Sequence, residues 1–248
     1  MQIPVQVLGG PTVLIEYGGL RFLTDPTFDD PGDYPSPSGR VLTKTAGPRV
    51  PLAGLGPVDA VLLSHDQHAD NLDTSGRALL ADVPRVLTTP AAAGRLGGSA
   101  EALTPWQTVD LPRPGGGTVT VTAAPALHGP EGSEPVVGEV TGFVLTADDL
   151  PTVYVSGDNA SLDLVKEIAA RFAPVDTAVL FAGAPRLPVL DNALLVLDGE
   201  GTATAARLLE ARRVVAAHCD SWTHFTEGRE HVVRAFEEAG LADLLQRD

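Results

Sequence analysis

Residues 64–71 read Ser64-His65-Asp66-Gln67-His68-Ala69-Asp70-Asn71, so two imidazoles and two carboxylates lie close together in the chain. The segment follows the apolar run at residues 59–63, which is typical of a strand buried on both faces of an α/β sheet. Such folds place their chemistry at the carboxyl ends of strands. Two histidines three residues apart can chelate one ion, and a carboxylate two residues further on can reach the same ion or its neighbour. The segment therefore indicates a metal site, with an exposed polar turn as the plain alternative.

Three further candidate ligands follow predicted strands in the same way. They are His128 after the strand at 118–123, Asp158 after the strand at 152–155, and His218 after the strand at 214–217. A hydrolytic metal site needs ligands from several strand ends, which fix the geometry and leave one position open for water. The sequence thus predicts one site assembled at several strand-to-loop transitions.

This ordered set resembles the metallo-β-lactamase superfamily, whose pattern is H-x-H-x-D-H followed by a single His, an Asp and a single His. The resemblance spans nearly all 248 residues and is closest to the single-domain hydrolases that include the L-ascorbate-6-phosphate lactonase-like proteins. Features shared with that branch are Leu23-Thr24-Asp25-Pro26, Ser156-Gly157-Asp158, and the trio Trp222, His224 and Phe225 after His218. The resemblance implies an α/β (α+β) fold, a four-layer αββα sandwich, and a single domain over residues 1–248.

The resemblance also implies which side chains hold metal. The first ion would be held by three histidines, namely His65, His68 and His128. The second ion would be served by Asp70, Asp158 and His218, with Asp158 bridging the two ions. Asp25 would support the loops of the site through hydrogen bonds, with an Asp-Pro turn as the alternative.

The sequence departs from the family pattern at two positions. Two residues separate His65 from His68 where the family has one, so Gln67 looks like an insertion in the turn. Asn71 stands where the family has a histidine for the second metal, and an amide oxygen is a weaker and harder ligand than imidazole. Three outcomes stay open: two ions with the second weakly held, one ion, or an Asn71 that only hydrogen-bonds while water completes the shell. We favour two Zn²⁺ ions, one loosely held, with Mn²⁺ or Fe²⁺ as alternatives.

The implied chemistry is hydrolysis by a metal-bound hydroxide, because a metal held by neutral histidines lowers the pKa of a bound water to about 7. Asp70 or Asp158 would orient the hydroxide and accept its proton. His224 is a candidate donor to a developing oxyanion, or else a partly exposed loop histidine. Our first choice of substrate is a small ester, lactone or amide. The alternatives are a phosphodiesterase acting on a small or lipid-like substrate, and a metal-poor, non-catalytic binding protein, for which Gln67 and Asn71 argue.

The composition of the chain indicates which classes of binding partner to expect. The net charge of −15 disfavours nucleic acid, which a negative field repels. No apolar run approaches the roughly 20 residues that span a bilayer, so we expect no membrane partner. Cys219 is the only cysteine and can form no disulfide within the chain, and together with the absence of an export signal this predicts a cytoplasmic protein. We expect a small-molecule substrate and leave open whether the protein is a homo-oligomer.

The segment from Pro26 to Pro51 differs in composition from the rest of the chain. Residues Pro26 to Pro51 are rich in proline and show no sustained periodicity, and a loop of this length is usually functional or mobile. With Phe28, Tyr34, Arg40 and Lys44 it could form a lid over the substrate, or be a structural surface loop. Elsewhere, apolar periodicity predicts strands at 3–8, 12–17 and 20–24, and helices at 75–81, from 89 onward, at 162–172, 202–212 and 230–246.

Overall fold

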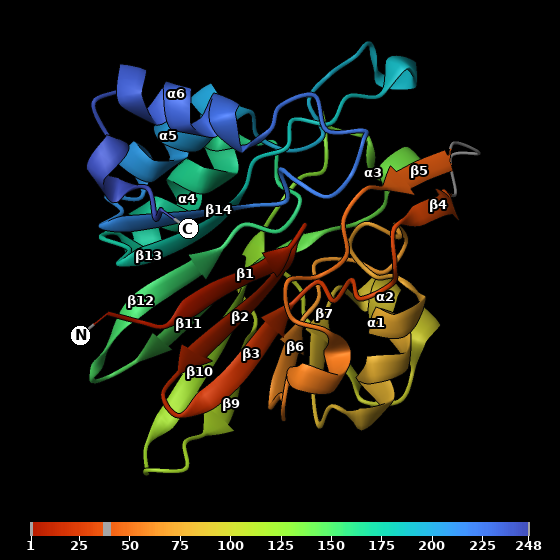
Figure 1. The fold of residues 1–248 in the computed structure, drawn as a ribbon. Coiled ribbons are helices and arrows are strands. Elements are labelled where there is room, and N and C mark those ends of the chain that lie inside the picture. Colours follow the sequence, from red (N-terminus) through yellow and green to blue (C-terminus); the bar gives the residue numbers. More distant parts are fainter. Residues whose placement is uncertain (1, 37–40, 248) are drawn as a thin grey trace.

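Two six-stranded sheets form the centre of the molecule in a computed structural model that describes residues 2–36 and 41–247 (Figure 1). In spatial order, the first sheet consists of β1 (Val5–Gly9), β2 (Thr12–Tyr17), β3 (Leu20–Thr24), β6 (Ala60–Leu62), β7 (Val86–Thr88) and β8 (Ala100–Ala102). The second consists of β14 (Arg213–Ala217), β13 (Thr177–Phe181), β12 (Leu150–Val155), β11 (Thr141–Ala147), β10 (Thr118–Pro125) and β9 (Thr108–Pro112).

The main core lies between the two sheets. In β13, Val179 and Phe181 belong to this central cluster, whereas Ala178 and Leu180 pack on the opposite face. Successive side chains of a strand point to opposite faces, so a strand covered on both sides must be apolar throughout. This explains why the candidate ligands come only after the apolar runs have ended.

Helices cover the outer face of each sheet. The second sheet is covered by α4 (Leu162–Phe172), α5 (Gly199–Leu208) and α6 (Arg229–Glu238), whose apolar sides share a buried cluster with it. The first sheet is covered on its outer side by α1 (Thr74–Leu79) and α2 (Pro90–Leu96), while α3 (Glu134–Val137) is a single turn. These four layers confirm the predicted αββα sandwich.

Two of the predicted helices have different bounds in the structure. The helix expected at 230–246 ends at Glu238, because Gly240 adopts a φ of +68° and a separate short turn follows at Ala242–Leu244. The helix expected at 202–212 begins earlier, at Gly199, because the Asp198 side chain accepts a hydrogen bond from the backbone N–H of Gly201 and caps it.

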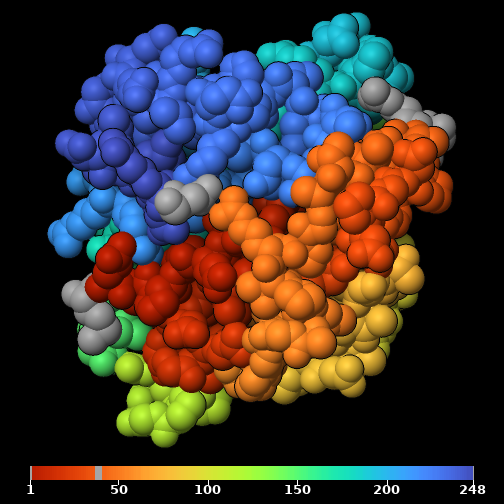
Figure 2. Space-filling view, in the orientation of Figure 1, coloured from red at the N-terminus to blue at the C-terminus, as the bar shows by residue number. Residues whose placement is uncertain are grey.

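The proline-rich segment contains a small antiparallel sheet, formed by β4 (Gly32–Pro35) and β5 (Val41–Lys44). Arg40 lies outside the described residues. The segment after residue 41 runs against the C-terminal part of the chain, as Figure 2 shows for the orange and blue surfaces. Backbone hydrogen bonds join the two: Thr45 N–H donates to the Ser221 carbonyl, and Thr223 N–H donates to the Thr43 carbonyl. The proline-rich segment therefore contains regular structure that is hydrogen-bonded to the C-terminal part of the chain.

Within the part of the chain that the structure describes, no helix combines the length and the apolar character that crossing a bilayer requires.

Candidate metal centre

The candidate ligands all follow strands of the two central sheets. His65 and His68 lie in the turn between β6 and α1, His128 follows β10, Asp158 follows β12, and His218 follows β14. All of these side chains are buried except that of His68, which is partly exposed. The structure thus brings together residues that are far apart in the sequence, as the spacing of the motifs predicts.

Three histidines form the tightest cluster of the site. One ring nitrogen from each of His65, His68 and His128 lies within 4.8 Å of the other two, the single such group of metal-ligating side chains among the described residues. His65 Nε2 and His68 Nδ1 are 2.9 Å apart. Ligands of a tetrahedral ion with bonds of about 2.0–2.1 Å are roughly 3.3 Å apart. The cluster is therefore compact enough for three ligands to converge on one small divalent ion.

The protonation of these histidines suits metal binding. Burial, together with the neighbouring imidazole of His68, lowers the pKa of His65 well below its ordinary value. Burial, together with His128, lowers the pKa of His68 to about 4. Both rings are neutral at physiological pH, so each has a nitrogen lone pair to offer, which is the form of imidazole that binds metal.

Hydrogen bonds behind two of the rings fix their tautomers. His128 Nδ1 is 2.9 Å from the carbonyl oxygen of Leu195 and must donate to it, which leaves the Nε2 lone pair free. His65 Nδ1 is 2.9 Å from Ser64 Oγ, which itself donates to Asp25 Oδ2 at 2.8 Å. In this relay His65 Nδ1 carries the proton, and the Nε2 lone pair faces His68 Nδ1. Such support is what orients histidine ligands in metalloproteins.

The two residues between His65 and His68 point away from the site. Asp66 forms a bidentate ion pair with Arg95, with a distance of 2.5 Å from Nη2 to Oδ1. Gln67 packs against Gly138, where a Cβ atom would lie only 2.0 Å from Gln67 Oε1. With one residue more than the family pattern, the turn still brings the rings of His65 and His68 together.

A second group of polar side chains lies beside the three histidines. His218 Nε2 is 3.4 Å from Asp158 Oδ1 and 3.5 Å from Asp70 Oδ2. His224 Nε2 is 3.0 Å from the same Asp70 oxygen, and His128 Nε2 is 3.7 Å from Asp158 Oδ2. Asp158 thus contacts imidazoles of both groups, as a bridging carboxylate would.

Both carboxylates of this group are ionised. Burial alone would raise the pKa of Asp158, but the imidazoles of His218, His128 and His65 outweigh it and hold that pKa far below the ordinary value. Burial also opposes ionisation of Asp70, and His224 and His218 overcome it and lower its pKa well below the ordinary range. The second group can therefore offer two anionic oxygens to a cation.

Asn71 is buried behind this group. Its Nδ2 donates to Asp158 Oδ1 at 3.2 Å and to Asp25 Oδ2 at 3.3 Å, while its Oδ1 is buried without a hydrogen-bond partner. Asp25 also accepts a hydrogen bond from the Ser64 N–H at 2.6 Å. The expected role of Asp25 in holding the loops of the site is thus confirmed, and its own pKa is raised to about 7 by burial and by the charge of Asp158, against the hydrogen bonds from Ser64.

Unusual backbone conformations occur at the same place. His218 has a φ of +54° and Asp25 a φ of +28°, values that residues other than glycine rarely adopt. Gly157, beside Asp158, has a φ of +57°, and a Cβ atom there would lie 2.5 Å from the Thr141 carbonyl oxygen. Such conformations cluster at functional sites, where the surrounding structure compensates for their strain.

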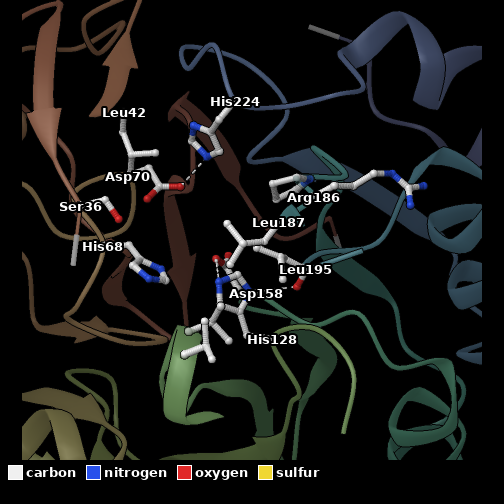
Figure 3. A pocket seen from close by; sticks show the side chains of 13 residues that line it. Ser36, Leu42, His68, Asp70, His128, Asp158, Arg186, Leu187, Leu195 and His224 are labelled. Carbon is white, nitrogen blue, oxygen red and sulfur yellow. Dashed lines mark hydrogen bonds and ion pairs between the residues drawn. The ribbon is translucent and has the colours of Figure 1, made fainter. Parts of the chain in front are cut away.

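A pocket opens onto these groups, and five of their side chains line it (Figure 3). The polar lining residues are Ser36, His68, Asp70, His128, Asp158, Arg186 and His224, and the apolar ones are Leu42, Val136, Val137, Pro185, Leu187 and Leu195. In Figure 3 the carboxylate of Asp70 faces the ring of His224, whereas the guanidinium of Arg186 extends away from the ligands. The pocket thus has a polar floor and largely apolar walls.

The metal-ligating and catalytic residues proposed from the sequence all lie in this region, but several other contributors carry no signal in the sequence. The apolar walls from Leu42, Leu187 and Leu195 have no motif. The hydrogen bond from His128 uses a backbone carbonyl 67 residues away, which carries no sequence signal.

The chain belongs to the family described as the beta-lactamase superfamily domain, whose model matches residues 20–219. This confirms the predicted superfamily, and the structure has the fold of its metal-dependent hydrolases. The narrower likeness to the lactonase-like branch stays a prediction.

Two solved structures and one sequence relative illustrate the likeness. Isothiocyanate hydrolase from Delia radicum gut bacteria has a TM-score of 0.79 and 22% identity, with 97% of this chain and 94% of that one covered. A possible metal-dependent hydrolase from Veillonella parvula has a TM-score of 0.82 and 16% identity, with 100% and 97% covered. An uncharacterized protein of Mycobacterium tuberculosis H37Rv is 38% identical over 87 residues, 34% of this chain and 22% of that protein. The match therefore spans about a fifth of the length of that relative.

Proposed function

We propose that the chain is a hydrolase that depends on a divalent metal and cleaves small esters, lactones or amides. The observation that carries the proposal is the convergence of three imidazoles, from His65, His68 and His128, beside a pocket that His68 and His128 line. Their spacing and their free lone pairs fit Zn²⁺, and imidazole with carboxylate also suits Mn²⁺ or Fe²⁺. An ion held there would supply a water nucleophile at neutral pH and polarise the electrophile's oxygen.

The remaining chemistry belongs to the protein's own groups. Asp70 and Asp158 are ionised and line the pocket, so each can orient an attacking water and accept its proton. The apolar walls would bind the carbon skeleton of the substrate and keep bulk water out, which strengthens the electrostatic interactions at the polar floor. We propose a small-molecule substrate for this reason.

Phosphodiester hydrolysis is the weaker candidate. Among the described residues that line the pocket, Arg186 is the only lysine or arginine. Its Nη1 donates to the Asn192 carbonyl at 2.9 Å, and its guanidinium extends away from the ligands in Figure 3. A pocket built to bind a phosphodiester would offer cationic donors near the ligands. A neutral carbon electrophile fits better, and the isothiocyanate hydrolase neighbour adds isothiocyanates to the substrates worth testing.

The test combines metal content with a substrate panel. Purified protein would be analysed by plasma mass spectrometry before and after reconstitution with Zn²⁺, Mn²⁺ or Fe²⁺. The panel would contain a nitrophenyl ester, lactones of several ring sizes, an anilide, benzyl isothiocyanate and bis(nitrophenyl) phosphate. We expect at least one equivalent of metal and turnover of carbonyl-type substrates. A metal content near zero after reconstitution would favour the non-catalytic binding protein, and turnover of the phosphodiester alone would favour the second candidate.

A further inference from the structure

We propose that His224 is a ligand of a second metal ion, in compensation for the histidine that Asn71 replaces. The inference deepens the proposed function and rests on it, because it presumes an ion at the three-histidine cluster. The second site would consist of Asp70, Asp158, His218 and His224.

The spacing around His218 is the first observation. Both ring nitrogens of His218 are buried and without a hydrogen-bond partner. Its Nε2 lies 3.4 Å from Asp158 Oδ1 and 3.5 Å from Asp70 Oδ2, which is longer than a good hydrogen bond of 2.7–3.2 Å. Ligands of one ion with bonds of about 2.1 Å are roughly 3.3 Å apart. His218 Nε2 is therefore at a ligand-like distance from each carboxylate, but the three donors are not mutually within 4.8 Å, so a shared cation would draw them closer together.

Asn71 is poorly placed to complete this set. Its Nδ2 points at two carboxylates, those of Asp25 and Asp158. Exchanging the amide oxygen and nitrogen would bring Oδ1 against the ionised carboxylate of Asp158. Asn71 therefore acts through Nδ2 as a hydrogen-bond donor that holds Asp158, and the site needs a donor from elsewhere.

His224, an imidazole outside the three-histidine cluster, contacts Asp70 and can supply it. The Nε2 of His224 is 3.0 Å from Asp70 Oδ2, and its Nδ1 is buried without a hydrogen-bond partner. The contact with Asp70 is therefore the hydrogen bond that the ring makes. The ring packs against Phe225, with centroids 4.5 Å apart. The loop that carries it is held by backbone hydrogen bonds from Thr223 to Thr43 and from Thr226 to Gly183. His224 is thus positioned by packing and backbone contacts.

The resulting ligand set has two imidazoles and two carboxylates, which suits Zn²⁺, Mn²⁺ or Fe²⁺. It is more open than the first site, because among the described residues only the three histidines bring their donors mutually within 4.8 Å. We therefore expect the second ion to bind more weakly than the first.

The test measures metal stoichiometry rather than activity. Wild-type protein, H224A, H224Q, N71H and the double variant N71H/H224A would be titrated with Zn²⁺ by calorimetry, and bound metal would be counted after gel filtration. We expect two equivalents in the wild type and one in H224A and H224Q, with the affinity of the first equivalent unchanged within about threefold. The double variant should recover the second equivalent, because the imidazole returns at position 71. His231→Ala, which removes a partly exposed histidine on α6, is the control and should keep two.

Three outcomes overturn the proposal. The first is a second equivalent that binds H224A as tightly as the wild type. The second is a wild type that binds a single ion at saturating Zn²⁺. The third is a loss of the first equivalent together with the second in both H224A and H224Q, which would make His224 a support of the whole site. A wild type that binds no ion would instead refute the proposed function itself. Circular dichroism would confirm that each variant is folded.

Discussion

The orientation of His128 is fixed by the Leu195 carbonyl, which occupies Nδ1 and leaves Nε2 to face the other two histidines. This residue joins the second sheet, through β10, to a ligand turn that belongs to the first. His128→Ala would remove a candidate ligand that lies in a loop after β10 rather than within a strand or helix.

His128→Ala should lose the first ion and most turnover. Removing a side chain that only hydrogen-bonds to a metal ligand lowers activity by up to about 100-fold. We expect a larger loss here, because the variant removes the ligand itself. Metal content and initial rates would be measured on the same preparation, with His231→Ala as the matched histidine control. Undiminished activity in His128→Ala would show that the site is wrongly placed.

At the scale of elements, the ligand turn is tied to two helices by Asp66. Arg95 of α2 forms the bidentate pair, and Arg77 of α1 donates from Nη2 to the Asp66 carbonyl at 3.0 Å. The Asp66 side chain is 3% exposed, so it depends on these partners for compensation of its charge.

Arg95→Met should therefore destabilise the protein by about 1–3 kcal/mol, the usual cost of leaving a buried acceptor unsatisfied. It should also weaken binding of the first ion by roughly 10–100-fold, because the turn positions two ligands. Urea unfolding and a Zn²⁺ titration would measure both effects. Arg85→Met is the control, because Arg85 pairs with Glu101 of β8 and not with the ligand turn, and both side chains are partly exposed. An equal loss of metal affinity in both variants would mean that Asp66 does not position the turn.

A buried ion pair between Lys44 and Asp73 anchors the small sheet of β4 and β5, which reaches the pocket. Lys44 Nζ is 3.2 Å from Asp73 Oδ2, with side chains 2% and 0% exposed. Asp73 also caps α1 by accepting a hydrogen bond from the Gly76 N–H. The pair thus links β5, where Lys44 forms an antiparallel bridge with Trp222, to the start of α1.

Lys44→Met should cost about 3–5 kcal/mol of unfolding free energy, because it leaves the Asp73 charge buried and unpaired. The double variant Lys44→Met/Asp73→Asn should recover part of this loss, since asparagine can still cap the helix without a charge. Chemical denaturation of both variants would decide. A double variant at least as unstable as the single one would contradict the charge argument.

At the scale of the whole molecule, the family resemblance carried by the order of the motifs was sufficient to predict the fold. The apolar runs before His65, Asp158 and His218 were predicted as strands, and the structure brings their ends together. What the sequence could not supply was the direction of side chains within loops. The role of Asn71 and the proximity of His224 to Asp70 depend on how two distant loops pack, and periodicity carries no information on that.

The centre also joins the two halves of the sandwich, because His65 and His68 follow a strand of the first sheet while His128 follows a strand of the second. An ion bound only by the folded state stabilises it, by about 4 kcal/mol at a concentration 1,000 times its Kd. For a chain of this size each kcal/mol shifts Tm by roughly 2–4 °C. Chelation should therefore lower Tm by about 8–16 °C in calorimetry, and readdition of Zn²⁺ should restore it. His128→Ala should show little response to the chelator, and a wild-type Tm that does not change on chelation would show that the ion does not link the two sheets.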